Sequence, residues 1–447
     1  MLDFLLIILF CIAGVCLGII TGLLPGLHVN NVALLLVSFS STIVASCSPL
    51  FTYSISEPFI LLLIAGFMIS VSVSHSFHDT IPSTFIGAPE EETALSVLPA
   101  HTLLLKGEGY KAVALAALGS YGAILFCFTL LYPLRFLLGP PIAFYDTIKE
   151  VMLWVLFSIV LLMILTEKTR ITEFGGSGKL PSLLGILFAA FVFTISGVFG
   201  LIIFEAHLAS PIGLPAPVLF PALAGLFGIP PLLTSVFTKP TIPHQKVEPL
   251  TQNSIEKKST MVSILTGSTA GIFVSLIPGL TTATGTVLAM NLRQKSSHEQ
   301  TIVTLSAVNT AATFSVTLML FLIERARSGV TIAIKDLMPI EPWDSSAMPL
   351  ELLYLLMFLL LSGALSFFFT LFIGRIFAGK FHIIPYQKLV VFTLLFVCAL
   401  VLLFTGVFGL MVLLVATSIG FLPLCWGVRR SHCMGVLLLP IILYFLS

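Results

Sequence analysis

The stretch Gly18-Ile-Ile-Thr-Gly-Leu-Leu-Pro-Gly-Leu27 interrupts the first hydrophobic segment of the chain, and a second copy, Gly271-Ile-Phe-Val-Ser-Leu-Ile-Pro-Gly-Leu280, lies far downstream. The two copies align without a gap, because Gly18 matches Gly271 and each Pro-Gly-Leu falls at the same offset of 253 residues. Proline removes a backbone donor and glycine tolerates left-handed geometry, so each copy predicts a break in a helix. Freed backbone groups at membrane depth are tolerated only inside protein or beside water. The duplicated break therefore predicts a functional site.

The composition predicts an integral membrane protein. Of the 447 residues, 57% are hydrophobic and 9% are charged, whereas an average soluble protein carries roughly 25% charged residues. Apolar runs of about 20 residues, long enough to cross roughly 30 Å of hydrocarbon, recur from end to end. We expect an all-α, polytopic protein of about 12 transmembrane helices in the cell membrane, with a retained first span and no targeting peptide. The net charge of +1 excludes a strong nucleic-acid-binding surface.

A polar segment divides the chain into two halves. Residues 238–260 contain four lysines and end just ahead of the second broken helix. We therefore expect an N-terminal transmembrane repeat at residues 1–237, a linker loop at 238–260 and a C-terminal transmembrane repeat at 261–447, in inverted orientation. A looser match supports the duplication, because Asp79-Thr-Ile-Pro-Ser-Thr-Phe85 parallels Asn309-Thr-Ala-Ala-Thr-Phe314 with one residue deleted.

Hydrophobic runs predict the individual spans. They are residues 2 to the first break, 28–45, 59–75, 112–132, 151–166, 183–204, the segments on both sides of the second break, 300–323, 352–373, 389–404, 406–421 and 433–445. Prolines within residues 211–231 predict a short hairpin or a bent span, and residues 167–179 predict a flexible charged loop. By the positive-inside rule the basic loops, residues 429–430 among them, would be cytoplasmic.

The most polar part of the membrane region covers residues 75–99. It is too rich in proline and polar residues for a continuous transmembrane helix, so we expect a re-entrant loop or a short broken helix. Pro89 followed by Glu90, Glu91 and Glu92 resembles a helix start, with proline at the first position and carboxylates in the first turn. These three glutamates are expected to cap a short surface helix.

The residues around the two breaks are the expected anion-binding site. Interrupted helices at corresponding places in two halves indicate the binding site of a secondary transporter, where half-helix N-termini face anionic groups. Hydroxyls and amides there add donors beside a positive dipole end. The expected substrate-binding residues are Pro25, Gly26, Leu27, His28, Asn30, Asn31, Pro278, Gly279, Leu280, Thr281, Thr282 and Thr284, with Thr286 following. The alternative is that Pro and Gly only kink packed spans while the threonines satisfy freed backbone groups.

Ionisable side chains next to a predicted span form a second candidate. His75, His78 and Asp79 would line the pathway or couple a proton, because ionisable groups in membranes are costly. They would otherwise belong to an interfacial loop. The residues assigned to ion coupling or the pathway are Asp79, His78, Thr80, Ser83, Asn309, Thr310 and Thr313. No zinc-ligand spacing accompanies them, so no metal site is expected.

Catalytic and ATP-binding motifs are missing from the sequence. No G-x-S-x-G and no G-x-x-x-x-G-K-[ST] occurs, so we expect neither an enzyme nor an ATP-driven pump. No cofactor is expected other than Na⁺ or H⁺ as a coupling ion. Glu205 and His207 should be interfacial, while Glu324, Arg325 and Arg327 end a long helix and could pair with one another.

The paired G-x6-P-G-L breaks, in a chain of this length, resemble the large membrane subunit of the tripartite tricarboxylate transporter family. The Pro82-Ser-Thr-Phe-Ile-Gly-Ala-Pro-Glu90 run looks like that family's polar segment, and Gly427-Val-Arg-Arg-Ser-His-Cys-Met-Gly-Val-Leu-Leu-Leu-Pro440 looks like archaeal members. The resemblance implies uptake of a small carboxylate, with a small four-helix membrane subunit and an extracytoplasmic binding protein as partners. His28, Asn30 and Asn31 stand where Gly and Thr residues commonly follow Pro-Gly-Leu, which bears on the identity of the substrate and on the need for a binding protein.

Three functions remain as hypotheses from the sequence. The first is an ion-coupled permease, or symporter, for an organic anion, which could work as a homo-oligomer in the bilayer. The second is translocation of a lipid-linked phosphate, since phosphate and carboxylate both suit a helix N-terminus. The third is an intramembrane enzyme that uses His75, His78 and Asp79.

Overall fold

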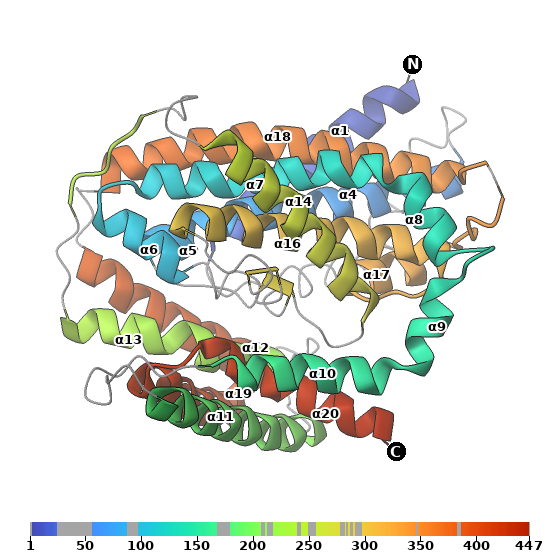
Figure 1. Cartoon of the computed structure of the whole chain (residues 1–447). Coiled ribbons are helices and arrows are strands. Elements are labelled where there is room, and N and C mark those ends of the chain that lie inside the picture. The colour runs from blue at the N-terminus through green and yellow to red at the C-terminus, as the bar shows by residue number, and fades with distance from the viewer. Residues whose placement is uncertain are drawn as a thin grey trace.

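The computed structural model describes residues 2–24, 56–86, 97–167, 179–206, 211, 218–238, 243–248, 256–277, 282, 285–286, 289–290, 297–345, 347–381 and 386–446. All its regular elements in these ranges are helices, as expected for an all-α chain. Figure 1 shows them in two groups, one above the other. The helix pairs that pack most extensively lie within one group or the other.

The upper group, here called the first bundle, contains ten helices of the described ranges. They are α1 (Leu2–Leu23), α4 (Glu57–His78), α5 (Thr80–Phe85), α6 (Val97–Leu105), α7 (Gly109–Thr129), α8 (Leu131–Leu138), α14 (Lys257–Leu276), α16 (His298–Leu322), α17 (Gly329–Leu337) and α18 (Leu350–Lys380).

The lower group, the second bundle, is formed by segments from both halves of the chain. Its elements are α9 (Phe144–Glu150), α10 (Met152–Leu165), α11 (Lys179–Glu205), α12 (Leu219–Leu223), the π-helical turn η3 (Ala224–Gly228), α13 (Ile229–Thr238), α19 (Tyr386–Trp426), the 3-10 turn η5 (Arg430–Met434) and α20 (Gly435–Leu446). Apolar side chains join the two bundles in a shared core, for example Phe85 of α5, Leu232 of α13 and Val390 of α19.

The described helices confirm a polytopic membrane protein. Nine of them are long and apolar enough to cross a membrane, and Met152–Leu165 and Arg430–Leu446 are shorter apolar helices. One of the nine, Gln387–Trp426, contains a non-helical Gly406 with φ 66° and ψ −164°. These backbone angles are not helical, and glycine adopts them readily. The segment therefore consists of two helices that meet at Gly406, in agreement with the separate spans expected at residues 389–404 and 406–421.

Helices α1 and α4 run parallel and pack very closely. A Cβ atom added to Gly14 would collide with Ser70, one added to Gly18 with Ser74, and one added to Gly22 with the His75 carbonyl. The partners advance along α4 as the glycines advance along α1, so the two helices point the same way. Glycine is required at these positions because a backbone approaches each of them.

Helices α14 and α16 form a second parallel pair of the same kind. A Cβ atom on Gly267 would collide with the Thr304 carbonyl, and one on Gly271 with the Val308 carbonyl. The helix that leads into each Pro-Gly motif therefore packs along a polar helix from the same half of the chain.

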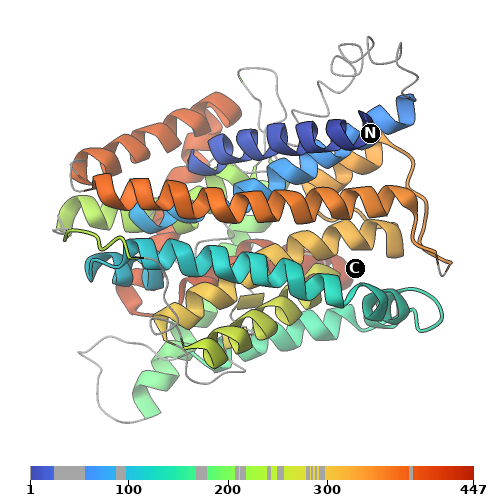
Figure 2. The ribbon, with the colours of Figure 1, turned by 90° about the horizontal axis from the view of Figure 1, so that it is seen from above.

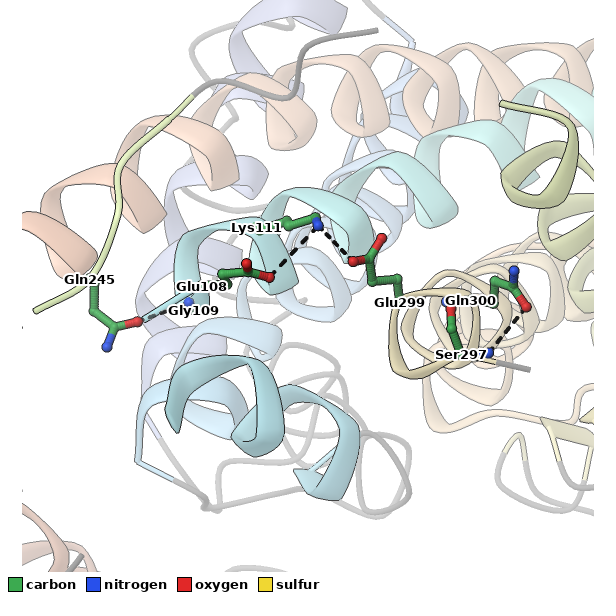
Figure 3. Close-up of polar contacts among 7 residues, drawn as sticks. All are labelled: Glu108, Gly109, Lys111, Gln245, Ser297, Glu299 and Gln300. Atoms are coloured by element: carbon green, nitrogen blue, oxygen red, sulfur yellow. Dashed lines mark hydrogen bonds and ion pairs between the residues drawn. The ribbon is translucent and has the colours of Figure 1, made fainter. Parts of the chain in front are cut away.

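The two pairs point in opposite directions. Lys111 and Glu299 join the N-terminal ends of α7 and α16 by an ion pair of 2.6 Å, so these helices are parallel (Figure 3). Helix α18 is antiparallel to α7, because Gly363 lies against Ile124 and Gly374 against Val113. It is parallel to α4, which therefore runs opposite to α16. Figure 2 shows α1 and α14 running in opposite directions across the bundle.

One pair of alternatives is decided by the described residues, and two expectations are corrected. The proline-rich region leading to residue 231 ends in one span, Leu219–Thr238, with a π-helical turn in its middle, which agrees with the expected bent span and not with the hairpin. Glu167, expected in a flexible charged loop, is 3% exposed. Arg430, expected in a cytoplasmic loop, is 5% exposed. Glu167 pairs with His432, and the Arg430 guanidinium donates to the Phe227 carbonyl, so both side chains are enclosed within the second bundle.

Candidate functional site

Polar side chains gather where α1 ends against α4. The Thr21 hydroxyl lies 3.1 Å from His75 Nδ1 and donates to the Gly18 carbonyl at 3.2 Å. The Ser74 hydroxyl donates to the Val15 carbonyl at 2.9 Å. Thr21 lies in the last turn of α1, so these bonds fix the end of the helix that precedes the first Pro-Gly motif in the sequence.

His78 connects this cluster to α18. Its Nδ1 lies 2.7 Å from the Ser74 carbonyl, which can only accept, so Nδ1 carries the proton. Its Nε2 lies 3.4 Å from the Thr370 hydroxyl of α18, which then donates to it. The His78 side chain is fully buried. These contacts hold the imidazole in one orientation between α4 and α18.

Asp79 lies at the junction of α4 and α5. Its backbone N–H donates to the His75 carbonyl at 2.9 Å, and its own carbonyl accepts from the Ser83 N–H at 3.1 Å. Its side chain is 3% exposed. A carboxyl group buried within a membrane helix is costly, and such groups mark ion or substrate pathways.

Thr80 and Ser83 use their hydroxyls within the helix. Thr80 Oγ1 donates to the Phe77 carbonyl at 2.8 Å, and Ser83 Oγ donates to the Thr80 carbonyl at 3.0 Å. These bonds satisfy backbone carbonyls around the junction. Both side chains are buried beside Asp79.

Helix α16 carries the second set of predicted polar residues. Asn309 is 3% exposed and Thr310 is 1% exposed. In the part of the chain that the structure describes, Asn309 Oδ1 and Thr310 Oγ1 make no hydrogen bond. Thr313 Oγ1 donates to the Asn309 carbonyl at 3.2 Å. Two buried polar groups with unused hydrogen-bonding capacity suit contact with a ligand or an ion.

Arg327 holds the last turn of α14 before the second break. Its Nη1 donates to the Ser275 carbonyl at 2.8 Å, and its Nη2 donates to the Tyr145 hydroxyl of α9 at 3.0 Å. Burial lowers the pKa of the Arg327 guanidinium from its ordinary value, while Tyr145 acts in the opposite direction. A positive charge at a helix C-terminus stabilises the negative dipole end. The sequence suggested pairing among Glu324, Arg325 and Arg327, whereas Arg327 contacts other elements.

Several predicted site residues lie outside the described residues. They are Pro25, Gly26, Leu27, His28, Asn30, Asn31, Pro278, Gly279, Leu280, Thr281 and Thr284, together with Pro89, Glu90, Glu91, Glu92 and His207. Thr282 is described; its carbonyl accepts from the Thr286 hydroxyl at 3.0 Å. The substrate-binding assignment of these residues remains a prediction.

One cluster of buried ionisable residues was missed by the sequence reasoning. Glu167 Oε2 lies 2.7 Å from His432 Nε2 and 3.5 Å from Arg429 Nε, within the second bundle. Two signals could have found it. The apolar runs before Glu167 and after His432 are too short to cross a membrane, and each ends in ionisable residues. Among the described residues, no group of three or more His, Cys, Asp or Glu side chains could hold a metal ion.

Comparison with known proteins identifies one family. The model of the tripartite tricarboxylate transporter TctA family matches residues 8–435. An uncharacterized protein of Methanocaldococcus jannaschii is 29% identical over 446 residues, which cover 98% of this chain and 99% of that protein. No solved structure matches the chain.

Proposed function

The chain belongs to the tripartite tricarboxylate transporter TctA family, and from that membership we propose that it is the permease for a small organic anion, specifically a carboxylate. The anion binds between the two Pro-Gly breaks, and an ion gradient drives its movement as a symport. A transporter family agrees with a chain that is not an enzyme. As a subunit of a tripartite system, it would work with a small membrane subunit and an extracytoplasmic binding protein.

The observation that carries the proposal is the matching construction of the two helix pairs. Gly14 and Gly267, like Gly18 and Gly271, differ by the same 253 residues as the two Pro-Gly motifs. Their contact partners on the second helix also keep one offset. Phe67 corresponds to Thr304, Ser70 to Ala307, Val71 to Val308 and Ser74 to Ala311, a constant separation of 237 residues. Equal spacing in both helices supports an internal repeat, and the opposite directions of the pairs support its inversion.

The offset between α4 and α16 also shows which polar residues occupy corresponding positions in the two helices. With an offset of 237 residues, Asn309 corresponds to Ser72, and Asp79 corresponds to Val316. The looser match between the motifs beginning at Asp79 and Asn309 has a different register and gains no support from the packing. The repeat is therefore argued from the glycine contacts and not from that match.

Anion binding follows from the position of the breaks. Helix α1 ends at Leu23 and α14 ends at Leu276, so one residue separates each helix from the proline of its Pro-Gly motif. A helix that restarts after such a motif would present free N–H groups and a positive dipole end, which favour a carboxylate. Asn30, Asn31, Thr281 and Thr282 are the proposed side-chain donors. Because α1 and α14 belong to opposed pairs, the two breaks would face the anion from opposite directions.

Ion coupling is proposed for the cluster at the end of α4. His75, His78 and Asp79 are buried there, while the corresponding positions of α16 hold Ala312, Ser315 and Val316. A carboxylate that releases or binds a cation changes the local charge, and this change can be linked to binding of an anion nearby. We assign Na⁺ or H⁺ to Asp79, with Thr80 and Ser83 as neighbouring oxygen atoms.

Uptake by proteoliposomes tests the proposed function. The purified chain is reconstituted and supplied with radiolabelled citrate, malate or acetate, under an inward sodium gradient, an inward proton gradient or neither. We expect one of these carboxylates to accumulate only when a gradient is present. Absence of accumulation of all three, with and without the two partner subunits, would contradict the proposal.

Transport of a lipid-linked phosphate remains the second candidate, because phosphate suits the same helix ends. The proteoliposomes distinguish it, since flipping of a fluorescent lipid phosphate without any carboxylate uptake would favour this candidate. Full uptake after replacing His75, His78 and Asp79 together would remove the coupling role assigned to them.

A further inference from the structure

Two short apolar helices of the second bundle, α10 and α20, have neighbouring ends: the C-terminal end of α10 lies near the N-terminal end of α20. Helix α10 has 14 residues and α20 has 12 residues, which correspond to about 21 Å and 18 Å at 1.5 Å per residue. Both are shorter than the roughly 30 Å of hydrocarbon. Glu167 follows the end of α10, and His432 lies in the η5 turn that precedes α20. The contact between Glu167 and His432 therefore joins two helices that are each too short to cross the membrane.

The contact lies near the middle of the apolar spans around it. The Ser196 hydroxyl of α11 donates to the His432 carbonyl at 3.3 Å, and Ser196 stands well inside the span Ser182–Glu205. The Arg430 Nη1 donates to the Phe227 carbonyl at 2.9 Å, and Phe227 stands at the centre of the span Leu219–Thr238. Two independent contacts thus place the cluster within the hydrocarbon depth of the protein.

The His432 ring is almost completely enclosed. His432 is 1% exposed and Glu167 is 3% exposed. One ring nitrogen, Nε2, is 2.7 Å from Glu167 Oε2. The other, Nδ1, makes no hydrogen bond within the described ranges of the chain. If Nε2–H donates to the carboxylate, Nδ1 carries a lone pair that can take up a proton.

The segments that meet at the cluster bring few titratable groups to it. Glu167 follows the end of α10, and Arg429, Arg430 and Cys433 lie in η5 or directly before it. The contacts from α11 and η3 come from a serine hydroxyl and a backbone carbonyl. The charged groups that the α10 end and the η5 segment bring to the cluster are therefore the Glu167 carboxylate and the guanidinium groups of Arg429 and Arg430.

We propose that Glu167 and His432 form a proton-binding site inside the second bundle, separate from Asp79 in the first. The proton binds the free nitrogen of the imidazole, and the carboxylate stabilises the imidazolium that forms. A metal cation is a poor occupant, because the Arg429 guanidinium already pairs with the same carboxylate. A proton needs no coordination shell, and histidine is the side chain whose charge changes near physiological pH.

The site would make transport depend on pH, a consequence that rests on the proposed function. The α10 end, the η5 turn and the π-helical turn all meet at the cluster. A change in its charge alters the forces between segments of both chain halves. Binding of a proton here would then bias the second bundle even where Na⁺ is the ion at Asp79.

Nuclear magnetic resonance of ¹⁵N-histidine-labelled protein in lipid nanodiscs tests the site without any substrate. Spectra are collected from about pH 5 to about pH 9, the range around the ordinary histidine titration. The signal that disappears in H432Q should show an unprotonated nitrogen at high pH and a second N–H at low pH. In E167Q the pH at which this change occurs should differ from that of the wild type, because the carboxylate that faces the imidazolium is gone.

The matched control is H298Q, since His298 is an exposed residue at the start of α16. It should leave the His432 signal and its E167Q shift unchanged. If H432Q does not fold, the E167Q shift assigns the signal, because His432 is the histidine that contacts Glu167. A His432 ring that keeps one protonation state over the whole range, or one that E167Q does not affect, would overturn the proposal.

The role in transport is tested separately in proteoliposomes with the same three carboxylates. The pH dependence of the initial uptake rate should flatten in H432Q and stay like wild type in H298Q. If no carboxylate is taken up, the proposed function fails while the titration result still stands. If uptake occurs and H432Q keeps the wild-type pH profile, the proton-site role in transport is wrong.

Discussion

The α1–α4 pair and the α14–α16 pair have the same backbone contact but different polar side chains along it. Both use glycines spaced four residues apart to bring a helix close to its polar neighbour. In the first pair, the polar helix α4 carries His75 and His78 and is followed by Asp79. In the second pair, the polar helix α16 carries Asn309, Thr310 and Thr313. Ionisable groups stand in the first pair, and neutral polar groups stand in the second.

This difference suggests a division of work between the halves. A close-packed scaffold can be duplicated without its chemistry, since glycine contacts depend on shape alone. Charged groups in a membrane are costly and are kept where they act. We infer that the first pair handles the coupling ion and that the second contributes neutral hydrogen-bonding groups to the anion.

The strongest test of this division is D79N. Asparagine keeps the size of the side chain but carries no negative charge, so it cannot bind a coupling cation in the same way. Gradient-driven carboxylate uptake should fall to that of protein-free liposomes. V316T, at the corresponding place in α16, serves as the control and should transport like wild type. Wild-type accumulation by D79N would break the comparison.

The ends of the two leading helices should differ in stability when their anchors are removed. R327M removes bonds from a charged donor to the Ser275 carbonyl and to Tyr145, which should cost about 1.5–3 kcal/mol of unfolding free energy. T21V removes neutral hydroxyl contacts and should cost less, about 0.5–1.5 kcal/mol. Denaturant unfolding of the purified variants measures both.

The exposed neighbour Arg325 provides the control for this pair of variants. R325M should leave the unfolding free energy unchanged. Equal losses for R325M and R327M would show that the Ser275 contact contributes nothing specific to the end of α14.

Because Gly18 and Gly271 make equivalent contacts, replacing either one by alanine should lower the unfolding free energy by a similar amount. In G18A and G271A the new methyl group would collide with the Val71 and Val308 carbonyls, and overpacking of this kind costs about 1–3 kcal/mol. Gly379 of α18 has no atom within 4 Å of an added Cβ, so G379A should be neutral or gain up to about 1 kcal/mol from helix propensity. Thermal unfolding compares the three. A loss in only one of the first two would contradict the repeat.

The smallest expected effect concerns the N-terminal ends of the polar helices. Glu299 of α16 pairs with Lys111 of α7, while Phe59 of α4 contacts Tyr354 of α18 edge to face at 6.0 Å. Double-mutant cycles should give about 0.2–1 kcal/mol for the partly exposed ion pair. The aromatic pair should give about 0.5–1.5 kcal/mol. Added salt should weaken only the ion pair, and equal salt dependence of both would be a contrary result.

The sequence predicted the helices of this fold well because their apolar runs are long. The duplication stays a prediction, which rests on the ungapped match of Gly18 with Gly271 and is supported by the same spacing of Gly14 and Gly267. The buried cluster at His75, His78 and Asp79 was found because ionisable residues stand out in an apolar chain. What each one touches could not be predicted, as the Thr370 contact of His78 comes from a distant helix.

The site at Glu167 and His432 was missed for a physical reason. Both residues border short apolar runs, and a charged residue at the end of a run normally lies at the membrane surface. Two such ends can be buried only if the runs meet inside the bundle, which depends on the packing of α10 and α20. The sequence match aligned Asn309 with Asp79, whereas the glycine contacts align Asn309 with Ser72. The contact partners of the glycines on α4 and α16 cannot be read from the sequence.

The most direct test of the central claim is a cryo-electron microscopy structure of the protein in nanodiscs with the carboxylate that it transports. The account predicts density for the carboxylate between residues 26–31 and 279–284, with Asn31 and Thr281 among its contacts. Density for the carboxylate elsewhere, with residues 26–31 and 279–284 far apart, would contradict the claim that the duplicated breaks form one site.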